Sequence, residues 1–325
     1  MSPSADMNPD RSRFPKCAIV TGASGFIGRS VTRHLAENGC IVKGIGTSEI
    51  STAERDALSI AEWYSGGISS EVLSQASKNA EVIFHCAGSG SVPLSLREPM
   101  VDFEKNVAAT ATVLNFSREN GKLPVVFLSS AGVYGNVAKI PIPVTASCDP
   151  ISPYGINKQI GEILVNQYAR CFDVPCAIVR LFSVYGAGLR KQLLWDASHK
   201  LHQGDFTFFG TGEESRDWIH VEDAAELIVR LWRHASVGVP VYNGACGDKV
   251  TNRHILGQLA ECYGLDHAIA FDGRGRPGDP KAYVADIATS LETGWHPRVA
   301  LREGLQGYAD WFRKNIIPEL SRKTD

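Results

Sequence analysis

The stretch CAIVTGASGFIG, residues 17–28, decides the fold of this chain. Its apolar run ends at Thr21, glycines follow at Gly22, Gly25 and Gly28, and apolar residues then recur at helical spacing. This order predicts a strand, a tight turn and a helix. Glycines so spaced permit the turn, a close approach of the backbone to a pyrophosphate, and close packing of helix on strand. Because the N–H groups that open such a helix face an anion, the stretch predicts a dinucleotide site.

The bulk properties of the 325-residue chain exclude several classes of protein. Its net charge is −2 and charges of both signs are scattered, so we expect no nucleic-acid partner. No apolar run is long enough to span a bilayer, and residues 1–15 are expected to form a disordered tail rather than a secretory signal. The eight cysteines include no Cys-x-x-Cys pair, so we expect no metal site, no disulfides and a cytoplasmic location.

Beyond the first helix, strands and helices alternate. Runs of strand length and runs of helical periodicity follow one another at residues 41–45, 81–85, 99–120, 125–128, 154–172 and 176–181. Alternation of this kind predicts an α/β, Rossmann-type doubly wound parallel sheet with right-handed crossovers. We expect a dinucleotide-binding domain over 16–181 and a smaller C-terminal substrate-binding lobe over 182–325, of which about 215–243 pack back on the first domain. Residues 47–67 show no clear pattern, and Ser70 is expected to cap a helix reaching residue 78.

Three side chains in this frame suggest a proton-transfer site. Tyr154 and Lys158 are four residues apart and share a helix face, and Ser130 ends the preceding strand. A lysine ammonium beside a phenol favours the phenolate, so we expect the pKa of Tyr154 to be lowered. Tyr154 could then exchange a proton with a substrate hydroxyl near neutral pH, while Ser130 holds the same oxygen. A surface tyrosine and a solvated lysine on an ordinary helix would show the same spacing.

Taken together, the glycine pattern, the run SSAGVYG at residues 129–135, and Tyr154 with Lys158 resemble the extended short-chain dehydrogenases/reductases. Within them the chain is most similar to nucleotide-sugar epimerases, dehydratases and ketoreductases of the UDP-glucose 4-epimerase type, over about residues 17–315. The resemblance implies that Ser130, Tyr154 and Lys158 are catalytic, with Tyr154 as the acid/base and Lys158 also binding the nicotinamide ribose. It implies a nucleotide-diphosphate sugar as substrate and NADP or NAD as cofactor.

The same resemblance implies a set of contact residues. The cofactor contacts are Gly22, Ser24, Gly25, Phe26, Ile27, Gly28, Gly46, Thr47, His85, Cys86, Ala87, Gly88, Asn106, Ser129, Tyr154 and Lys158. The substrate contacts are Ser130, Ser183, Arg216 and Arg276. The two arginines would bind the diphosphate, because a guanidinium fork suits phosphate oxygens. For either arginine alone, a surface salt bridge is the alternative.

The chain departs from the family pattern in three places. Ala131-Gly132 stands where family dehydratases carry an acidic pair, so we set dehydration aside. Gly46 stands where NAD-specific members end the second strand with an aspartate; its absence permits NADP, with Arg29 and Arg33 as possible sources of charge unless they are simply solvated. Replacing Gly46 by Asp is therefore expected to shift preference toward NAD. Ser183 stands in place of an asparagine that contacts the sugar.

Three functions remain open. The first is an epimerase that removes and returns a hydride at C4 of a nucleotide-diphosphate hexose. The second is an NADPH-dependent 4-ketoreductase, which uses the same residues in one direction only and which Gly46 favours. The third is a non-catalytic dinucleotide sensor, against which the intact Ser130, Tyr154 and Lys158 argue, although the fold alone does not exclude it.

The helices expected over 99–120 and 154–172 also carry more apolar surface than one sheet-facing stripe requires. In the second, Ile156, Ile160, Ile163 and Leu164 are expected to point inward, yet the last three span a wide arc. The resemblance implies a homodimer in which these helices form a four-helix bundle. Burial of the whole arc within one subunit is the alternative.

Overall fold

The computed structural model describes residues 13–274 and 282–321 and is built around a seven-stranded sheet in the order β11-β6-β5-β4-β1-β2-β3. All neighbouring strands in it run parallel. The strands are β1 (Cys17–Thr21), β2 (Ile41–Ile45), β3 (Glu62–Tyr64), β4 (Val82–His85), β5 (Val125–Ser130), β6 (Cys176–Leu181) and β11 (Val241–Gly244). The order reverses between β1 and β4, and ligands of such sheets bind at this switch point. The predicted Rossmann-type doubly wound sheet is confirmed.

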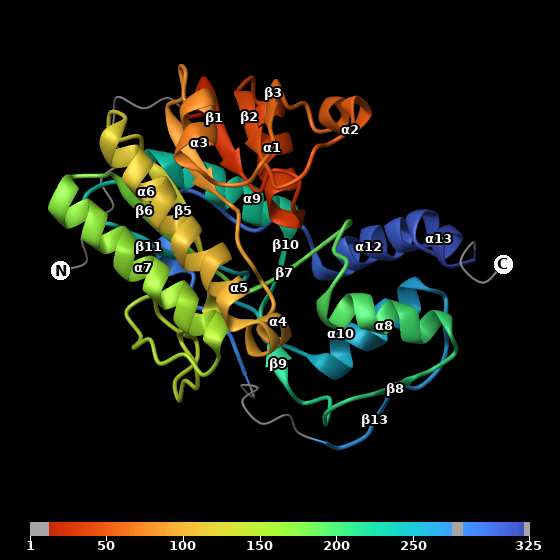
Figure 1. The fold of residues 1–325 in the computed structure, drawn as a ribbon. Coiled ribbons are helices and arrows are strands. Elements are labelled where there is room, and N and C mark those ends of the chain that lie inside the picture. The colour runs from red at the N-terminus through yellow and green to blue at the C-terminus, as the bar shows by residue number, and fades with distance from the viewer. Residues whose placement is uncertain (1–12, 275–281, 322–325) are drawn as a thin grey trace.

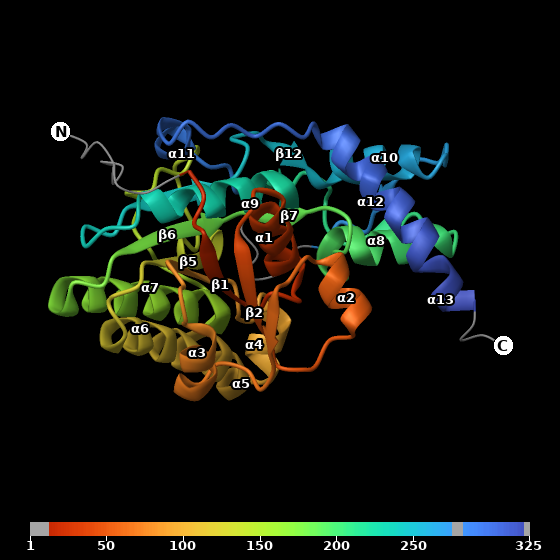
Figure 2. The same ribbon diagram turned by 90° about the horizontal axis from the view of Figure 1, so that it is seen from above.

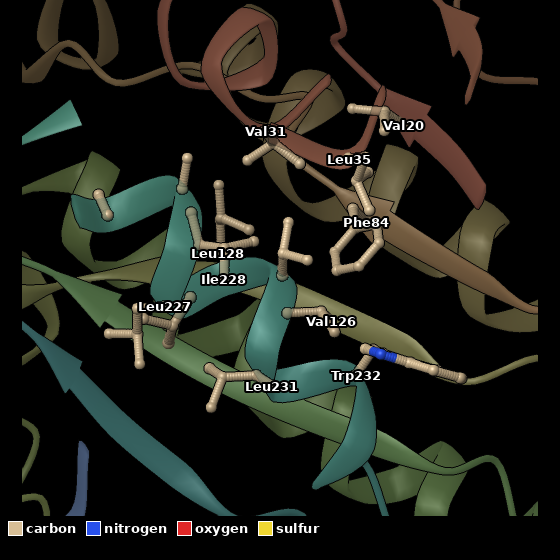
Figure 3. Packing of buried hydrophobic residues seen from close by; sticks show 14 of the residues in the cluster. Val20, Val31, Leu35, Phe84, Val126, Leu128, Leu227, Ile228, Leu231 and Trp232 are labelled. Atoms are coloured by element: carbon tan, nitrogen blue, oxygen red, sulfur yellow. The ribbon is translucent and has the colours of Figure 1, made fainter. Parts of the chain in front are cut away.

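Helices cover both faces of the sheet (Figure 2). One face carries α1 (Phe26–Glu37) and α9 (Val221–Arg230), and the other carries α3 (Ser70–Ala76), α6 (Ala109–Glu119) and α7 (Pro153–Phe172). Figure 3 shows side chains of α1 and α9 packed on those of β1, β4 and β5. The fully buried residues of this layer include Val20, Val31, Leu35, Phe84, Val126, Leu227 and Ile228. Burying each such side chain stabilises the fold by about 1.5–3 kcal/mol.

A second group of helices lies beyond one edge of the sheet (Figure 1). Its helices α8 (Gln192–His202), α10 (Asn252–Cys262) and α12 (Leu301–Asn315) share a buried cluster, and α13 (Ile317–Ser321) follows α12. Short strand pairs accompany these helices: β7 (Ser183–Tyr185) with β10 (Trp218–His220), β9 (Ser215–Arg216) with β12 (Val250–Thr251), and β8 (Thr207–Phe208) with β13 (Ala270–Phe271). From the intervening segment, α9 packs on α1 and β11 joins the main sheet. The division into a dinucleotide-binding domain over 16–181 and a substrate-binding lobe over 182–325 stays a prediction.

Two regions of the nucleotide-binding half differ from expectation. Residues 47–67 contain α2 (Thr52–Ala57) and the edge strand β3, and α3 is capped by Ser69, whose Oγ accepts from the N–H of Val72. After α4 (Val92–Arg97), the helix expected over 99–120 is interrupted: α5 (Pro99–Phe103) leads into a π-helical turn at Glu104–Ala108 before α6. Such turns frequently occur at functional sites. The remaining helix of more than one turn is α11 (Ala288–Glu292).

The inward face predicted for α7 is wrong at Ile156 and Ile163, which are 45% and 60% exposed, whereas Leu164 packs against the buried cluster as predicted. Apart from Val165, the buried residues of the helix are small or polar. The reason is the close approach of α7 to the sheet: a Cβ on Gly155 would lie 2.5 Å from the carbonyl oxygen of Gly132, and one on Gly161 would lie 2.6 Å from the ring of Phe127. Glycine is therefore required at positions 155 and 161 of the buried face, and Ile156 and Ile163 beside them are left exposed.

The N-terminal part of the described chain, beginning at residue 13, packs against the helices that cover the sheet. Trp232 donates from its indole N–H to the carbonyl of Arg13 (3.3 Å), and the ring of Phe14 lies 5.7 Å from that of His34. Arg13 and Phe14, which belong to the tail expected over 1–15, are therefore packed against the rest of the protein, and residues 1–12 lie outside the described residues. Within residues 13–274 and 282–321, no helix is both long enough and apolar enough to cross a membrane.

Candidate active site

The turn between β1 and α1 forms a cradle that only glycine permits. Gly22 has φ +66°, and a Cβ there would lie 2.8 Å from the backbone of Ala87. A Cβ on Gly28 would lie 2.0 Å from the carbonyl oxygen of Gly22, and no side chain caps the first turn of α1 at Gly25. The backbone therefore leaves space and free N–H groups at the helix N-terminus, which suits a pyrophosphate. The cradle fits a dinucleotide cofactor.

The loop after β4 is fixed beneath this cradle by a buried histidine. Nδ1 of His85 is hydrogen-bonded to Oγ1 of Thr21 (2.8 Å) and Nε2 to Oγ1 of Thr110 (3.1 Å), and the same Thr21 hydroxyl accepts from the N–H of Ala87 (3.2 Å). Burial lowers the pKa of His85 to about 3, so its ring is neutral. Because both ring nitrogens are engaged, His85 offers a cofactor only its backbone; its side chain fixes the loop that continues to Gly88.

The three predicted catalytic residues lie together. Ser130 lies near enough to Tyr154 to lower the pKa of its phenol, and Oγ of Ser130 accepts from the N–H of Gly132 (3.1 Å). A Cβ on Gly132 would lie 3.4 Å from Oγ of Ser130 and 3.6 Å from the Tyr154 ring. Glycine at 132 thus leaves room beside both hydroxyls. One turn further along α7, the Lys158 ammonium donates to the carbonyl of Leu128 (3.0 Å).

Burial dominates the acidity of the tyrosine and the lysine. It raises the pKa of Tyr154, and the influence of Ser130 only partly opposes this. It lowers the pKa of Lys158 to about 8, although the negative charge of Asp102 acts in the other direction. Because burial outweighs the influence of Ser130, the pKa of Tyr154 is raised rather than lowered, and the predicted direction is wrong. The Lys158 ammonium is hydrogen-bonded to the carbonyl of Leu128 instead.

Asn106 completes the site from the π-helical turn. Its Nδ2 donates to both the carbonyl oxygen and Oδ1 of Asp102 (3.1 Å each), while its buried Oδ1 has no hydrogen-bond partner among residues 13–274 and 282–321. A Cβ on Gly88 would lie 2.8 Å from that Oδ1 and 3.3 Å from Nζ of Lys158. A buried acceptor without a partner is costly, so this place suits a ligand hydroxyl or an ordered water.

A different arrangement closes the far end of the cradle. A Cβ on Gly46 would lie 2.5 Å from two ring atoms of Trp63, and one on Gly44 would lie 2.8 Å from a third. The indole N–H of Trp63 donates to the carbonyl of Ser48 (3.2 Å). Gly46 is therefore glycine because an indole covers the end of β2. Sequence reasoning missed Trp63, since its pairing with Gly44 joins β2 to a strand that had no clear pattern.

Arg29 is also engaged at this end. Its Nε donates to the carbonyl of Ser24 (2.7 Å), and its guanidinium pairs with the carboxylate of Glu54 on α2. The side chains of Arg29 and Glu54 are 43% and 32% exposed, so solvent screens the pair. The positive charge considered for NADP is thus present next to the cradle, but it is shared with an acidic residue.

The serine before the catalytic one is occupied by a buried ion pair. Oγ of Ser129 donates to Oε1 of Glu162 (2.6 Å), and Arg180 donates to both carboxylate oxygens of Glu162 (2.9 and 2.7 Å). Ser129 could therefore reach a cofactor only through its backbone. The pair ties α7 to β6 directly behind Ser130.

The proposed substrate contacts come from the second group of elements. Ser183 lies on β7, where its N–H donates to the carbonyl of Asp217 (3.0 Å), and Arg216 lies on β9 with its guanidinium 5.8 Å from the ring of Tyr283. The carboxylate of Asp217 accepts from three backbone N–H groups at 2.8–3.1 Å, and burial raises its pKa to about 6. Arg276 lies outside the described residues.

Lys191, at the N-cap of α8, is a charged residue that sequence reasoning missed. A Cβ on Gly90 would lie 2.9 Å from its Nζ, and its charge lowers the pKa of Lys158. Burial of the ammonium lowers the pKa of Lys191 itself. The loop between β7 and α8 brings this second ammonium toward Lys158, a placement that no local spacing reveals.

A glycine cradle at the switch point of a doubly wound sheet, joined to a serine–tyrosine–lysine group, defines an extended short-chain dehydrogenase/reductase. The family model described as the NAD dependent epimerase/dehydratase family matches residues 18–245, and the chain belongs to this family. Within the described part of the chain, no group of three or more His, Cys, Asp or Glu residues could hold a metal ion.

Known relatives resemble the chain over nearly its whole length. It is 31% identical over 312 residues to a UDP-glucose 4-epimerase of Mycolicibacterium smegmatis, which covers 91% of this chain and 98% of the relative. The solved structure of a UDP-glucose 4-epimerase with UDP-glucose from Thermotoga maritima is 28% identical, with a TM-score of 0.81, covering 92% of this chain and 99% of that one. The structure of MoeE5 in complex with UDP-glucuronic acid and NAD is 26% identical, with the same TM-score and coverage.

Proposed function

We propose that the protein is an epimerase that inverts C4 of a nucleotide-diphosphate hexose. The observation that carries this proposal is the juxtaposition of Ser130 and Tyr154 beside a cradle that fits a dinucleotide, in a chain whose relatives include UDP-sugar 4-epimerases. A nicotinamide cofactor bound in the cradle would accept a hydride from C4 and return it. The chain itself has to move one proton and hold one oxygen.

Tyr154 performs the proton transfer in this mechanism. It takes the proton of the 4-hydroxyl as the substrate is oxidised and returns it when the sugar is reduced on its other face. Ser130, which lies beside Tyr154, holds the same oxygen, and the absence of a side chain at Gly132 leaves room for it. Burial keeps Tyr154 protonated when the site is empty, so its loss of a proton requires added positive charge in the site.

Lys158 supplies part of that charge. With a pKa of about 8 it is mainly protonated at neutral pH, and its position near Gly88 and Asn106 supports the contact with the nicotinamide ribose that the family resemblance implies. The unpartnered Oδ1 of Asn106 offers an acceptor at the same place. NAD and NADP both remain candidate cofactors, because Gly46 lacks the acidic side chain that would repel a 2′-phosphate.

The diphosphate of the substrate would be held by cations from the second group of elements. Arg216 is the predicted contact, and we add Lys191, whose ammonium lies beside Gly90 near the catalytic lysine. Ser183 is the proposed contact to the sugar. The short serine leaves more space than an asparagine, which suits a substrate with a substituent at that place.

The function is tested by incubating the protein with UDP-glucose and with UDP-galactose in the presence of NAD or NADP. Interconversion of the two sugars without a net change of absorbance at the nicotinamide band supports an epimerase. In a second incubation, with NADPH and a 4-keto sugar nucleotide, consumption of the two mole for mole would instead establish the ketoreductase. Binding of dinucleotide without turnover of any UDP-hexose or UDP-hexuronate would favour the sensor.

We also propose that the protein is a homodimer. An outward face formed by α4, α5 and α7 carries large exposed apolar side chains: Leu96, Met100, Phe103, Ile156 and Ile163. Exposed apolar side chains gathered on neighbouring elements mark an interface, and pairing of the α5–α6 segment and α7 with their counterparts across a two-fold axis would form a four-helix bundle beside this face. Light scattering that gives a monomer mass across micromolar concentrations would refute the dimer.

A further inference from the structure

A fully buried carboxylate lies behind the catalytic residues. Asp102, on α5, is completely buried. Its Oδ1 accepts from Nδ2 of Asn106 (3.1 Å) and its Oδ2 accepts from Nδ2 of Asn157 on α7 (2.8 Å). Asp102 thereby connects the π-helical turn to the residue that directly precedes Lys158.

This carboxylate is not part of an ion pair. Within the described residues, no lysine or arginine nitrogen comes within salt-bridge distance of it, and both of its side-chain partners are neutral amides. Burying a charge without a direct counter-charge is expensive. The two asparagine amides therefore stabilise the carboxylate without neutralising it. Its negative charge then acts on the neighbouring ionisable groups.

We propose that Asp102 is a positioning residue of the catalytic site, which orients the Asn106 amide and supplies negative charge behind Tyr154 and Lys158. Orientation follows from the hydrogen bonds: with Nδ2 of Asn106 held by Asp102, Oδ1 is directed toward Gly88, beside Nζ of Lys158. A protonated or neutral side chain at 102 would release this amide to rotate.

The electrostatic effect follows from the groups that surround Lys158. Asp102 faces it from α5, Glu162 from its own helix, Cys86 from the loop after β4 and Lys191 from the N-cap of α8. Among these, Asp102 exerts the largest upward influence on the pKa of Lys158, against the stronger downward influence of burial. It also raises the pKa of Tyr154, in the same direction as burial. Removing the charge should therefore lower both pKa values, so that Lys158 loses its proton at a lower pH.

The direct test is the titration of Lys158 in the full-length protein, followed by NMR of ¹³Cε-labelled lysine and assigned by comparison with Lys158→Met. In Asp102→Asn the midpoint should fall by about 1–3 pH units, the range for loss of a nearby opposite charge. The double variant Asp102→Asn/Asn157→Asp returns the carboxylate to the neighbouring position and should recover most of this shift. Asn157→Ala removes one hydrogen bond but keeps the charge, so its midpoint should stay near that of the wild type.

These variants separate positioning from simple stability. A purely structural Asp102 would lower the melting temperature in Asp102→Asn and Asn157→Ala alike, with no difference in the Lys158 midpoint. An unchanged midpoint in folded Asp102→Asn would overturn the proposal. Should Asp102→Asn fail to fold, a double variant that folds with a wild-type midpoint supports the proposal, and one with a lowered midpoint overturns it.

The catalytic consequence rests on the proposed function, whereas the titration does not. In Asp102→Asn the alkaline fall of epimerase activity should shift to lower pH together with the Lys158 midpoint. If the midpoint shifts but no UDP-hexose is turned over by the wild type, the proposed function fails and the role of Asp102 in charging Lys158 stands. If activity is present and neither quantity shifts, only the inference about Asp102 fails.

Discussion

The two ends of the nucleotide cradle are built in different ways. At the catalytic end, Ser130, Tyr154 and Lys158 come from β5 and α7, and their neighbours Gly88 and Gly132 leave space around them. At the other end, where β2 stops, an indole fills the space above Gly46 and an arginine is paired with an acid. At the catalytic end the Tyr154–Lys158 pair follows a spacing within a single helix, whereas the other end depends on contacts between separate elements.

The comparison teaches where selectivity can vary in this fold. The catalytic group requires a fixed relation between one strand and one helix, which a close glycine contact between α7 and Gly132 enforces. The far end is assembled from α2 and β3, which lie at the edge of the sheet and carry no catalytic residue. Residues there can change the preference for a cofactor without disturbing the proton transfer. Three predictions test this separation.

The largest effect is expected at the catalytic end. Tyr154→Phe removes the hydroxyl that transfers the proton and keeps the ring that lies beside Gly132. Loss of a general acid or base typically reduces the rate by about 10²–10⁴. Turnover of the UDP-sugar should fall by this factor, while fluorescence titration shows unchanged dinucleotide affinity. Turnover near that of the wild type under matched conditions would contradict the role assigned to Tyr154.

Much of the fold and of the catalytic end could be predicted from the sequence. Strand runs and glycine spacing are local signals, and they located β1, β2, β4, β5 and β6 as well as the Tyr154–Lys158 pair. The inward face of α7 could be predicted only in part by hydrophobicity, because at Gly155 and Gly161 the helix approaches Gly132 and Phe127 so closely that only glycine fits. Trp63, Glu54 and Lys191 reach the site through tertiary contacts, for which the chain carries no local pattern.

An intermediate effect is expected where the indole covers β2. Gly46→Asp alone would place its Cβ against the Trp63 ring, so the simple shift toward NAD expected from the sequence is replaced by overpacking. We expect a loss of about 1–3 kcal/mol in the free energy of unfolding, measured in urea, with weaker binding of both dinucleotides.

A second variant, which also removes the indole, decides whether the contact with Trp63 causes the weaker dinucleotide binding of Gly46→Asp. Gly46→Asp/Trp63→Ala gives the aspartate room and should show a favourable coupling energy in the double-mutant cycle with Trp63→Ala as the control. Only in the double variant should the affinity for NAD exceed that for NADP, because the carboxylate then faces the ribose. Independent, additive effects of the two substitutions would show that Trp63 does not restrict position 46.

The smallest effect is expected at the Arg29–Glu54 pair, and it addresses the charge of the far end without altering its shape. Glu54 is the third residue of α2, whose N-cap Ser51 accepts from the N–H of Glu54 (3.1 Å). Glutamine is equally compatible with this position of a capped helix, so Glu54→Gln should leave α2 folded. It removes the negative charge that now accompanies the Arg29 guanidinium beside Ser24. A 2′-phosphate would then lie near the Arg29 guanidinium, whose positive charge is no longer offset by the Glu54 carboxylate.

Because both side chains are partly exposed, the gain in NADP affinity should be small, about 0.2–1 kcal/mol or up to roughly fivefold. Affinity for NAD should not change, since it has no 2′-phosphate, and Arg29→Gln should lose the gain when combined with Glu54→Gln. Titrations at low and at high salt provide a second check, as an effect between exposed charges diminishes with ionic strength. Equal changes for NAD and NADP would mean that the pair acts on the shape of the cradle rather than on its charge, and the two ends would then be less separate than their construction indicates.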